Sequence, residues 1–504
     1  MTRSAGTRRS AAQLLTDTLD PRSFLPWHDR LVDVHPNASY ARQLAAARER
    51  TGLDEAVVVG EGRVGGRRIA VLAGEFGFLG GSVGVAAAQR LLTAVERATR
   101  ESLPLVALPC SGGTRMQEGA VAFAQMIKIA AAVSDHKRAG LPYLVYLRHP
   151  TTGGVFASWA SMGHITAAEP DALVGFLGPR VVEALGSPMP DGVQSTGNLL
   201  RHGIIDAVVP PEELGSWLRR CLGILEPAGR RALGEATSAQ LRAHDGYRLP
   251  SDAWESVLAS RRPGRVGAWD VLTAIAPRHL SLNGSGEGEV APGILAAVAR
   301  IADIPCVFLG HGTRARQGGA APGPNGAALR VARRAIRLAA ELALPLVTVI
   351  DTAGAELSVA AEQEGIAGQI ARCLAELVTL DSPTVSVLLG QGAGGAALAW
   401  LPADRVIATQ HAWLGPLPPE GASAVVHHDV EHAPQLAREQ GMDVASLCRH
   451  GIVDQVIGED GDGPALCRRL EAAVGGALRA LVVMDPADRY HRRRLRYRGL
   501  GVPG

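Results

Sequence analysis

Short apolar runs alternate with longer segments of helical periodicity along most of this chain. In the N-terminal half, the runs at Arg67–Phe76, Leu103–Pro109 and Leu141–Leu147 each contain a short, uninterrupted apolar stretch, as buried strands do. Between them, apolar residues at helical spacing predict helices over Val85–Arg100 and Met116–Ala139. Strands that alternate with helices in this way predict an α/β domain whose strands are buried on both faces.

The C-terminal half shows the same alternation. Strand-like runs occur at Ile304–Gly312, Leu344–Ile350 and Thr384–Gly390, and helices are predicted near Gly326–Ala343 and Ala360–Leu380. The order of elements therefore matches that of the first half, which suggests that one domain fold occurs twice.

Direct sequence repetition supports this interpretation. LPLV stands at Leu103–Val106 and again at Leu344–Val347, and the pair Gly153-Gly154 returns at the same offset as Gly394-Gly395. Further on, LLRHGIID returns as LCRHGIVD after a few extra residues. A repeat of such long period is typical of two tandem domains, because the periods of solenoid proteins are much shorter.

The pattern divides the 504 residues into five segments. We expect a helical lead-in over residues 1–50, a first domain over 51–225, a polar linker over 226–265, a second domain over 266–487 and a basic tail over 488–504. A basic run at a chain end is more often solvated or frayed than a phosphate site, so the tail is expected to be an exposed end.

Composition narrows the function classes. A net charge of +2 argues against wholesale nucleic-acid or membrane binding, and an aromatic content of 4% argues against base-stacking platforms. The six cysteines form no CxxC pair, so neither a zinc site nor a disulfide framework is expected. With no apolar run of about 20 residues and no secretory signal, the sequence predicts a reduced, cytoplasmic setting.

Two glycine pairs are the strongest chemical signal. In TTGGVFAS (Thr151–Ser158) and GAGGAALA (Gly392–Ala399), a strand ends in Gly-Gly and a helix begins. The first N–H groups of a helix have no partner within it, and two of them aimed at one oxygen form an oxyanion hole. One such pair alone is more typical of a tight turn, but two at matching positions favour a functional role. We expect the turns Cys110–Gly119 and Asp351–Ser358 to lie beside them at the same sheet edge.

Other motifs offer weaker alternatives. GFLGGSVG (Gly77–Gly84) lacks the GK[ST] of a P-loop. His427–Pro434 has histidines at metal-ligand spacing, but an exposed helix start is the favoured interpretation. His202 and His450, in the repeated RHGI, favour a structural role at a helix end. Ser111 lacks the flanking glycine of a nucleophile elbow, so the sequence does not support covalent catalysis.

At these motifs the chain resembles the carboxyltransferase component of biotin-dependent acyl-CoA carboxylases, within the crotonase superfamily. GEFGFLGGSVG, SGGTRMQEG and LPYLVYLRHPTTGGVFASWASMGH are similar to the β subunit of bacterial acetyl-CoA carboxylase. IDTAGAELSVAAEQEGIAGQIARCLAEL, GQGAGGAALAWLPADRVI and GPLPPEGASAVV are similar to its α subunit. The resemblance covers roughly residues 60–215 and 295–460. It implies two tandem crotonase-like (ClpP/crotonase) β-β-α superhelical domains.

The resemblance also implies an activity. A carboxyl group would pass from carboxybiotin, carried on a separate protein, to the α-carbon of an acyl-CoA through an enolate; acetyl-CoA would give malonyl-CoA for fatty acid biosynthesis. Biotin carboxyl carrier protein and biotin carboxylase would be separate partners, because this chain has no biotin-attachment motif or ATP-grasp pattern. The family places its site between two protomers, so a homodimer or larger oligomer is implied.

Residues are assigned by matching the family's motifs. Gly153 and Gly154 would hold the enolate oxygen, and Gly395 and Ala396 would polarise the ureido oxygen of carboxybiotin. Biotin's own nitrogen would take the proton, so no side-chain base and no metal are expected. The other residues expected to border the substrates are Gly112, Gly113, Arg115, Val155, Phe156, Arg180, Gly354, Gly394 and Ala397, of which the two arginines are candidates for binding the CoA phosphates.

The sequence departs from the family pattern on the biotin side. Ala353 replaces a proline, Glu356 replaces an aromatic residue, and Asn325 replaces a glutamate. The N-terminal four-cysteine zinc ribbon of the β subunit is also missing. Two alternatives therefore stay open: a biotin- or carrier-dependent decarboxylase on the same fold, and a catalytically degenerate subunit of a carboxylase complex.

Overall fold

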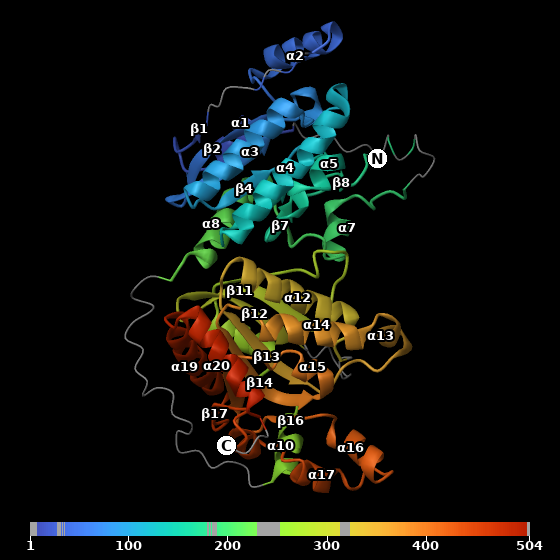
Figure 1. The fold of residues 1–504 in the computed structure, drawn as a ribbon, viewed down its shortest axis with the longest axis vertical. Coiled ribbons are helices and arrows are strands. Elements are labelled where there is room, and N and C mark those ends of the chain that lie inside the picture. The colour runs from blue at the N-terminus through green and yellow to red at the C-terminus, as the bar shows by residue number, and fades with distance from the viewer. Residues whose placement is uncertain are drawn as a thin grey trace. The chain divides into compact units, whose positions relative to one another are not determined.

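The computed structural model describes residues 8–27, 36–178, 189–228, 252–312 and 323–500, together with residues 32, 34, 181 and 183. The chain divides into two compact units (Figure 1). The first consists of Met1–Gly223 and Gly286–Gly288, and the second of Ile224–Ser285 and Glu289–Gly504.

The first unit is built on a seven-stranded sheet in the order β1-β2-β3-β4-β5-β7-β9. β1, β2 and β3 pair antiparallel, and from β3 onward all pairs are parallel. Every residue of β4 and β5 is buried, as the continuous apolar runs predict. The strands are β1 (Leu25–Pro26), β2 (Val57–Val64), β3 (Arg67–Gly74), β4 (Leu105–Leu108), β5 (Tyr143–Leu147), β7 (Ile165–Ala168) and β9 (Ala207–Val208), and off this sheet β6 (Thr151–Thr152) pairs with β8 (Val174–Gly175).

The helices of the first unit begin and end close to the predicted positions. α3 (Val85–Arg100) has the bounds that the periodicity predicts, and it packs along α4 (Gly119–Arg138). Its buried residues include Ala87, Leu91 and Ala94, which lie on one face. The remaining elements are α1 (Ala11–Thr18), α2 (Ala38–Thr51), η1 (Leu79–Gly81), η2 (Met116–Glu118), α5 (Gly153–Phe156), η3 (Trp159–Ser161), α7 (Thr196–Arg201), η4 (Pro211–Glu213) and α8 (Leu214–Leu225).

The second unit repeats this architecture. Its sheet has the order β10-β11-β12-β13-β14-β15-β17, with β16 paired to β14. β10, β11 and β12 are antiparallel, and the pairs that follow are parallel. The strands are β10 (His279–Ser281), β11 (Ile294–Ile301), β12 (Ile304–His311), β13 (Leu346–Thr352), β14 (Thr384–Ala393), β15 (Arg405–Thr409), β16 (Trp413–Gly415) and β17 (Gln455–Ile457).

The helices of the second unit cover its sheet (Figure 1). α12 starts as predicted, with the Asn325 side chain accepting the N–H of Ala328 as an N-cap. The helices are α10 (Ala253–Ser260), α11 (Ala268–Ile275), α12 (Gly326–Glu341), α13 (Val359–Gln363), α14 (Ile366–Val378), α15 (Gly394–Leu398), α16 (Pro419–Val426), α17 (Ala433–Glu439), α18 (Val444–Arg449), α19 (Gly463–Val482) and α20 (Pro486–Arg498). Among the helices described, none combines the length and apolar character needed to cross a membrane.

Part of the predicted linker belongs to a hydrophobic core. α10 buries Ala253 and Val257 against Ala393, Trp413 and other residues of the second unit. The indole N–H of Trp413 also donates to Ser260 Oγ at 2.9 Å. The prediction of a polar linker over 226–265 is therefore wrong for α10, because its few apolar residues face one side; residues 229–251 lie outside the described part.

The basic tail is not a frayed end. α20 turns Arg489 and Arg493, four residues apart, toward the second unit, where both are buried. Arg493 Nη1 donates to Leu380 O at 2.7 Å and to Leu377 O at 3.2 Å, so it caps the C-terminal end of α14. Its Nε and Nη2 bind the two carboxylate oxygens of Asp404 at 2.8 and 3.0 Å. The basic run is ordered here because Arg493 binds the carbonyl oxygens at the end of α14 and the buried carboxylate of Asp404.

We predict that Arg493→Ala lowers the free energy of unfolding by about 3–5 kcal/mol, because the variant leaves the Asp404 carboxylate buried without its bidentate partner. Urea titration followed by circular dichroism measures the change. Arg492→Ala, an exposed arginine of the same helix, is the matched control and should change stability by less than about 0.5 kcal/mol. Equal effects from both variants would show that α20 is not anchored through Arg493.

Candidate functional site

The first glycine pair starts helix α5 directly after β6. Gly153 has φ +65°, a left-handed conformation that glycine adopts readily, and its N–H donates to Phe176 O at 2.9 Å. The N–H groups of Gly154 and Val155 follow in the first turn and have no backbone acceptor among the described residues. Among the described residues, the N–H groups without a backbone acceptor are thus those of Gly154 and Val155, one position further along than the predicted pair Gly153 and Gly154.

A second glycine-rich segment, the first glycine turn (Ser111–Arg115), lies against this helix start. A Cβ built on Gly153 would stand 3.0 Å from the Cα of Gly113, and one built on Gly113 would stand 3.2 Å from the Cα of Gly153. The two backbones therefore pack directly on each other. The prediction that this turn lies beside the glycine pair is confirmed.

The contacts explain why two residues at the helix starts are glycine. A Cβ on Gly154 would meet Thr114 Oγ1 at 2.8 Å, and one on Gly395 would meet Ile370 Cδ1 at 2.9 Å. These two glycines therefore allow close packing of each helix against its neighbours.

A hydroxyl closes the first glycine turn. Ser111 Oγ accepts the N–H of Gly113 at 2.9 Å and donates to Gly113 O at 3.3 Å. Ser111 is buried, and its hydroxyl bonds no histidine or carboxylate among the described residues. Burial raises the pKa of the neighbouring Cys110 thiol to about 11, so it stays protonated. Neither side chain is placed as an activated nucleophile.

The second unit repeats this turn at the corresponding positions. In the second glycine turn (Thr352–Glu356), Thr352 Oγ1 accepts the N–H of Gly354 at 3.2 Å and donates to Gly354 O at 3.0 Å. Nearby, α15 begins at Gly394, which has φ +65° as Gly153 does. The helix N-terminus and the hydroxyl-closed turn are therefore common to both copies.

The two copies differ in how closely turn and helix approach. Among the described residues, a Cβ on Gly354 would meet no atom within 4 Å, whereas its counterpart Gly113 touches the backbone of Gly153. Ala396 and Ala397, in the first turn of α15, are buried. Within the described part of the chain, the second turn therefore lacks the close backbone contact that the first turn makes.

Asp351, at the end of β13, was not singled out from the sequence. Its Oδ1 accepts the N–H of Gln391 at 2.8 Å, and burial raises its pKa. A Cβ on Gly390 would stand 2.5 Å from that oxygen and 2.6 Å from Arg265 Nη1. An acidic residue ending a buried strand was the signal that could have revealed it.

The predicted cationic clamp for CoA phosphates is not supported. Arg115 is completely buried and forms an ion pair with Glu55, so a phosphate cannot reach its guanidinium. The identification of Arg115 as a phosphate ligand is wrong, because the sequence did not show that a carboxylate far along the chain would neutralise it. Arg180 lies outside the described residues. Phe156 lies half-buried at the end of α5.

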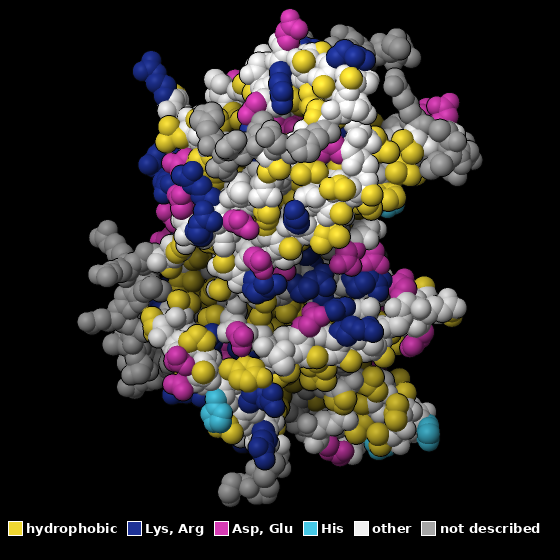
Figure 2. Space-filling view, turned by 45° about the horizontal axis from the view of Figure 1, so that its top comes forward, with side chains coloured by type: hydrophobic (Ala, Val, Ile, Leu, Met, Phe, Trp, Pro, Cys, Tyr) yellow, Lys and Arg dark blue, Asp and Glu magenta, His cyan; other side chains and the backbone are white. Residues whose placement is uncertain are grey.

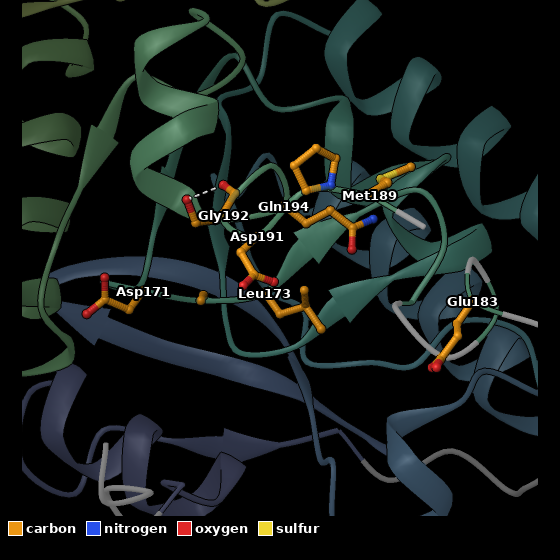
Figure 3. A pocket seen from close by; sticks show the side chains of 10 residues that line it. Asp171, Leu173, Glu183, Met189, Asp191, Gly192 and Gln194 are labelled. Atoms are coloured by element: carbon orange, nitrogen blue, oxygen red, sulfur yellow. Dashed lines mark hydrogen bonds between the residues drawn. The ribbon is translucent and has the colours of Figure 1, made fainter. Parts of the chain in front are cut away.

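A pocket of about 500 Å³ lies next to β8, the strand that follows helix α5 and the first glycine pair (Figure 3). Leu173 and Met189 line it together with the carboxylates Asp171, Glu183 and Asp191. Three carboxylates repel phosphates, so this pocket does not suit the phosphate end of CoA. Gln194, also in the lining, donates to Leu177 O at 2.7 Å and holds the segment after β8.

Exposed apolar side chains border both sites at equivalent repeat positions. Met116 and its counterpart Leu357 are 83% and 96% exposed, and Phe176 and its counterpart Leu417 are 65% and 42% exposed. In Figure 2, hydrophobic side chains, in yellow, gather in several places on the face that is drawn. Apolar patches of this kind mark surfaces that bind another molecule.

The histidine-rich segment before α17 is a helix start, as expected. His432 is the N-cap residue of α17, and its Nδ1 lies 2.7 Å from Asp429 Oδ2. His427 stacks on His432 with ring centroids 4.3 Å apart. Across the part of the chain that is described, no group of three or more His, Cys, Asp or Glu side chains could hold a metal ion.

Two mixed sheets, each with a glycine-initiated helix beside a hydroxyl-closed turn, define a tandem crotonase-like protein. Transcarboxylase 12S, solved with methylmalonyl-CoA and methylmalonic acid bound, has the same fold: the TM-score is 0.74 at 20% identity over 95% of this chain and 91% of that one. A single-chain, multi-domain long-chain acyl-CoA carboxylase matches with a TM-score of 0.68 at 18% identity over 92% of this chain and 45% of that one. The prediction of tandem crotonase-like domains is confirmed.

Sequence comparison gives the family. A probable biotin-dependent acyl-coenzyme A carboxylase beta3 subunit of Mycobacterium tuberculosis (strain ATCC 25618 / H37Rv) is 55% identical over 98% of this chain and 99% of the relative. The acetyl-coenzyme A carboxylase carboxyl transferase subunits beta/alpha of Salinispora tropica are 37% identical over 99% of this chain and 92% of the relative. Residues 8–455 match the carboxyl transferase domain. The chain belongs to the carboxyl transferase family, that of the carboxyltransferases of biotin-dependent acyl-CoA carboxylases.

We predict that Ser111→Ala lowers the free energy of unfolding by about 1–3 kcal/mol, because the variant leaves the N–H of Gly113 buried without an acceptor. Ser111→Thr is the matched control: it keeps the hydroxyl and installs the residue that the second unit uses at Thr352. Urea titration should place Ser111→Thr closer to the wild type than Ser111→Ala. The opposite order would contradict the role of the hydroxyl.

A pH dependence follows from His311, which stacks on Trp400 with ring centroids 3.8 Å apart. Burial lowers the pKa of His311 from 6.5 to about 3. The folded state therefore binds this proton less readily than the unfolded state, so stability should be full above about pH 6.5 and should fall as the pH decreases toward 3. His311→Phe, which keeps an aromatic ring beside Trp400, should show a shallower loss of unfolding free energy across this window; an unchanged slope would contradict the assignment.

Proposed function

We propose that the chain transfers a carboxyl group from carboxybiotin on a separate carrier protein to the α-carbon of an acyl-CoA. The observation that carries this proposal is the pair of repeat-related helix starts, each beside a hydroxyl-closed turn, in one chain of the carboxyl transferase family. A transfer between two carbonyl-like groups needs two places where negative charge on an oxygen is stabilised.

In the first unit, the N–H groups of Gly154 and Val155 would receive the thioester oxygen of the acyl-CoA. As the α-proton leaves, charge develops on that oxygen, and the N–H groups bind the enolate more tightly than the thioester. Loss of one such donor typically costs about 10²–10³ in rate. In this scheme Gly153, Gly112 and Gly113 shape the turn and do not donate, because their N–H groups already have acceptors.

In the second unit, the first turn of α15 would receive the ureido oxygen of carboxybiotin, with Gly395 and Ala396 as the matched donors and Gly394, Ala397 and Gly354 around them. Polarising that oxygen favours release of CO₂, which the enolate then attacks. The biotin nitrogen that loses CO₂ takes the α-proton. This path needs no basic side chain.

We propose acetyl-CoA as the acyl substrate, with propionyl-CoA as the nearest alternative. The Salinispora relative is named for acetyl-CoA, and transcarboxylase 12S holds methylmalonyl-CoA. Biotin carboxyl carrier protein and biotin carboxylase are the proposed partners, and the cytoplasm is the proposed compartment. We also propose a homo-oligomer, because the exposed apolar side chains Met116, Phe176, Leu357 and Leu417 border both sites.

A catalytically degenerate subunit is the second candidate. In the second glycine turn, Glu356 places a carboxylate near the proposed carboxybiotin site, where the Ser358 hydroxyl donates to its Oε1 at 2.7 Å. A negative charge there opposes a carboxylated ligand. This candidate predicts acyl-CoA binding without turnover. A decarboxylase on the same fold would instead release CO₂ and carboxylate no acyl-CoA.

The reverse reaction tests the proposal. Purified protein given free biotin and malonyl-CoA should form acetyl-CoA at a rate that depends on biotin, and methylmalonyl-CoA tests the propionyl alternative. Forward carboxylation of acetyl-CoA with a carboxylated carrier then separates carboxyltransferase from decarboxylase. Absence of turnover with both malonyl thioesters would contradict the proposal.

A variant of the second site adds a sharper prediction. Gly395→Val should lower biotin-dependent turnover by about 10²-fold, because its side chain collides with Ile370 and displaces α15. Binding of malonyl-CoA, measured by calorimetry, should stay within about twofold, since the proposed acyl site lies in the other unit. Gly476→Val in α19 is the control, because a Cβ there meets no atom of the described residues within 4 Å. Equal activity in the two variants would remove the second site from the mechanism.

A further inference from the structure

A buried charged network lies directly behind the first glycine turn. Arg115 is completely buried, and its Nη1 and Nη2 donate to the two carboxylate oxygens of Glu55, with an Nη1 to Oε2 distance of 2.8 Å. Nη2 also donates to Ser82 O at 2.6 Å. Its guanidinium therefore joins three segments that are distant in sequence: the start of β2, the loop Phe78–Gly84 and the first glycine turn.

The same loop and turn are joined through their backbones. Val83 N–H donates to Gly113 O at 2.9 Å, and Arg115 N–H donates to Val83 O at 3.0 Å. Gly112 N–H donates to Gly80 O at 2.8 Å. The first glycine turn thus lies along the loop Phe78–Gly84. Arg115 is bonded to this loop through its side chain as well as through its backbone.

The lead-in helix α2 supplies the remaining member of the network. Its Tyr40 hydroxyl donates to Glu118 Oε1 and accepts from Arg115 Nη1 at 3.2 Å. Burial, together with the bond to Glu118, raises the pKa of Tyr40 to about 12, so the hydroxyl remains a donor. Glu118 Oε2 in turn accepts the N–H of Val85 at 2.6 Å and caps the N-terminus of α3.

We propose that Arg115, Glu55, Tyr40 and Glu118 form a positioning unit that holds the first glycine turn against Gly153 and so orients the N–H groups of Gly154 and Val155. This inference rests on the proposed function, because it concerns the rate of the transfer reaction. Because none of the four side chains is exposed, in this scheme they act without touching either substrate. They act through the backbone contact between Gly113 and Gly153, where any shift of the turn displaces the start of α5.

The network is better explained by the orientation that it imposes on its partners than by any gain in folding free energy. A buried ion pair is often no more stabilising than apolar residues of the same volume, since both charges lose their hydration. What it supplies is direction: a planar guanidinium binds a carboxylate and a carbonyl at fixed angles, and a lysine cannot reproduce that fork. Displacement of a reacting group by about 1 Å can cost about 10²-fold in rate.

The test uses the full chain and two conservative variants, Tyr40→Phe and Arg115→Lys. For both, kcat for biotin-dependent turnover of malonyl-CoA should fall by about 10- to 100-fold, while KM for malonyl-CoA stays within about twofold. The positive charge that lysine retains should not restore kcat in Arg115→Lys. Calorimetric binding of malonyl-CoA and circular dichroism establish that each variant is folded and still binds.

Asp54→Asn is the matched control. It breaks the bidentate ion pair with Arg90 in the same unit, one residue from Glu55, and this pair does not touch the glycine turn. Its kcat should stay within about twofold of the wild type. An inactive wild type would refute the proposed function itself. An active wild type with unchanged kcat in folded Tyr40→Phe and Arg115→Lys, or with equal losses in Asp54→Asn, would overturn the positioning role alone.

Discussion

The contact on which the first site depends is that between two stretches of backbone, Gly113 and Gly153, with no side chain between them. Because a Cβ on either residue would come within about 3.2 Å of the other's Cα, both must be glycine while the turn and helix stay this close. A bare backbone contact has few atoms of its own to fix its geometry. Groups outside the contact must therefore hold the two backbones in place. In this structure they are the Ser111 hydroxyl and the buried Arg115 guanidinium.

The duplication preserved some of these features and lost others. A glycine with φ +65° at the helix start and a hydroxyl that closes the neighbouring turn occur in both units. The close contact is not seen in the second unit, where a Cβ on Gly354 would meet no atom of the described residues within 4 Å and one on Gly395 would meet Ile370. The shared parts form a helix start beside a hydroxyl-closed turn, and the parts that differ are the contacts around the two glycines.

Local pattern was enough to predict most strands and helices, and it placed the first glycine turn beside Gly153. It failed where the deciding partner lies far along the chain. Arg115 was a candidate for binding the CoA phosphates because the sequence gives no sign that Glu55, 60 residues away, neutralises its guanidinium. The tail suggested a frayed end because nothing in a basic run reveals that Asp404, 89 residues from Arg493, is buried. Charged residues carry no periodic signal of burial, so only the folded partner decides their role.

Helices α2 and α20, which lie outside the repeat, each contact a segment close to one of the glycine-rich sites. In the first unit, α2 brings Tyr40 to the network behind the first glycine turn. In the second, α20 brings Tyr497 to the residues that follow α15, where its hydroxyl accepts the N–H of Ala403 at 2.8 Å, while Arg493 holds Asp404. Each of these helices thus places a tyrosine hydroxyl against the segment next to one glycine-rich site. The buried arginine comes from α20 in the second unit, but in the first unit it is Arg115 of the glycine turn itself. A crotonase-like core can supply helix N-termini wherever a strand ends in glycine, but a backbone donor cannot adjust its direction by side-chain rotation. Its direction must be set by what packs around it, and here part of that packing comes from α2 and α20, which lie outside the repeat.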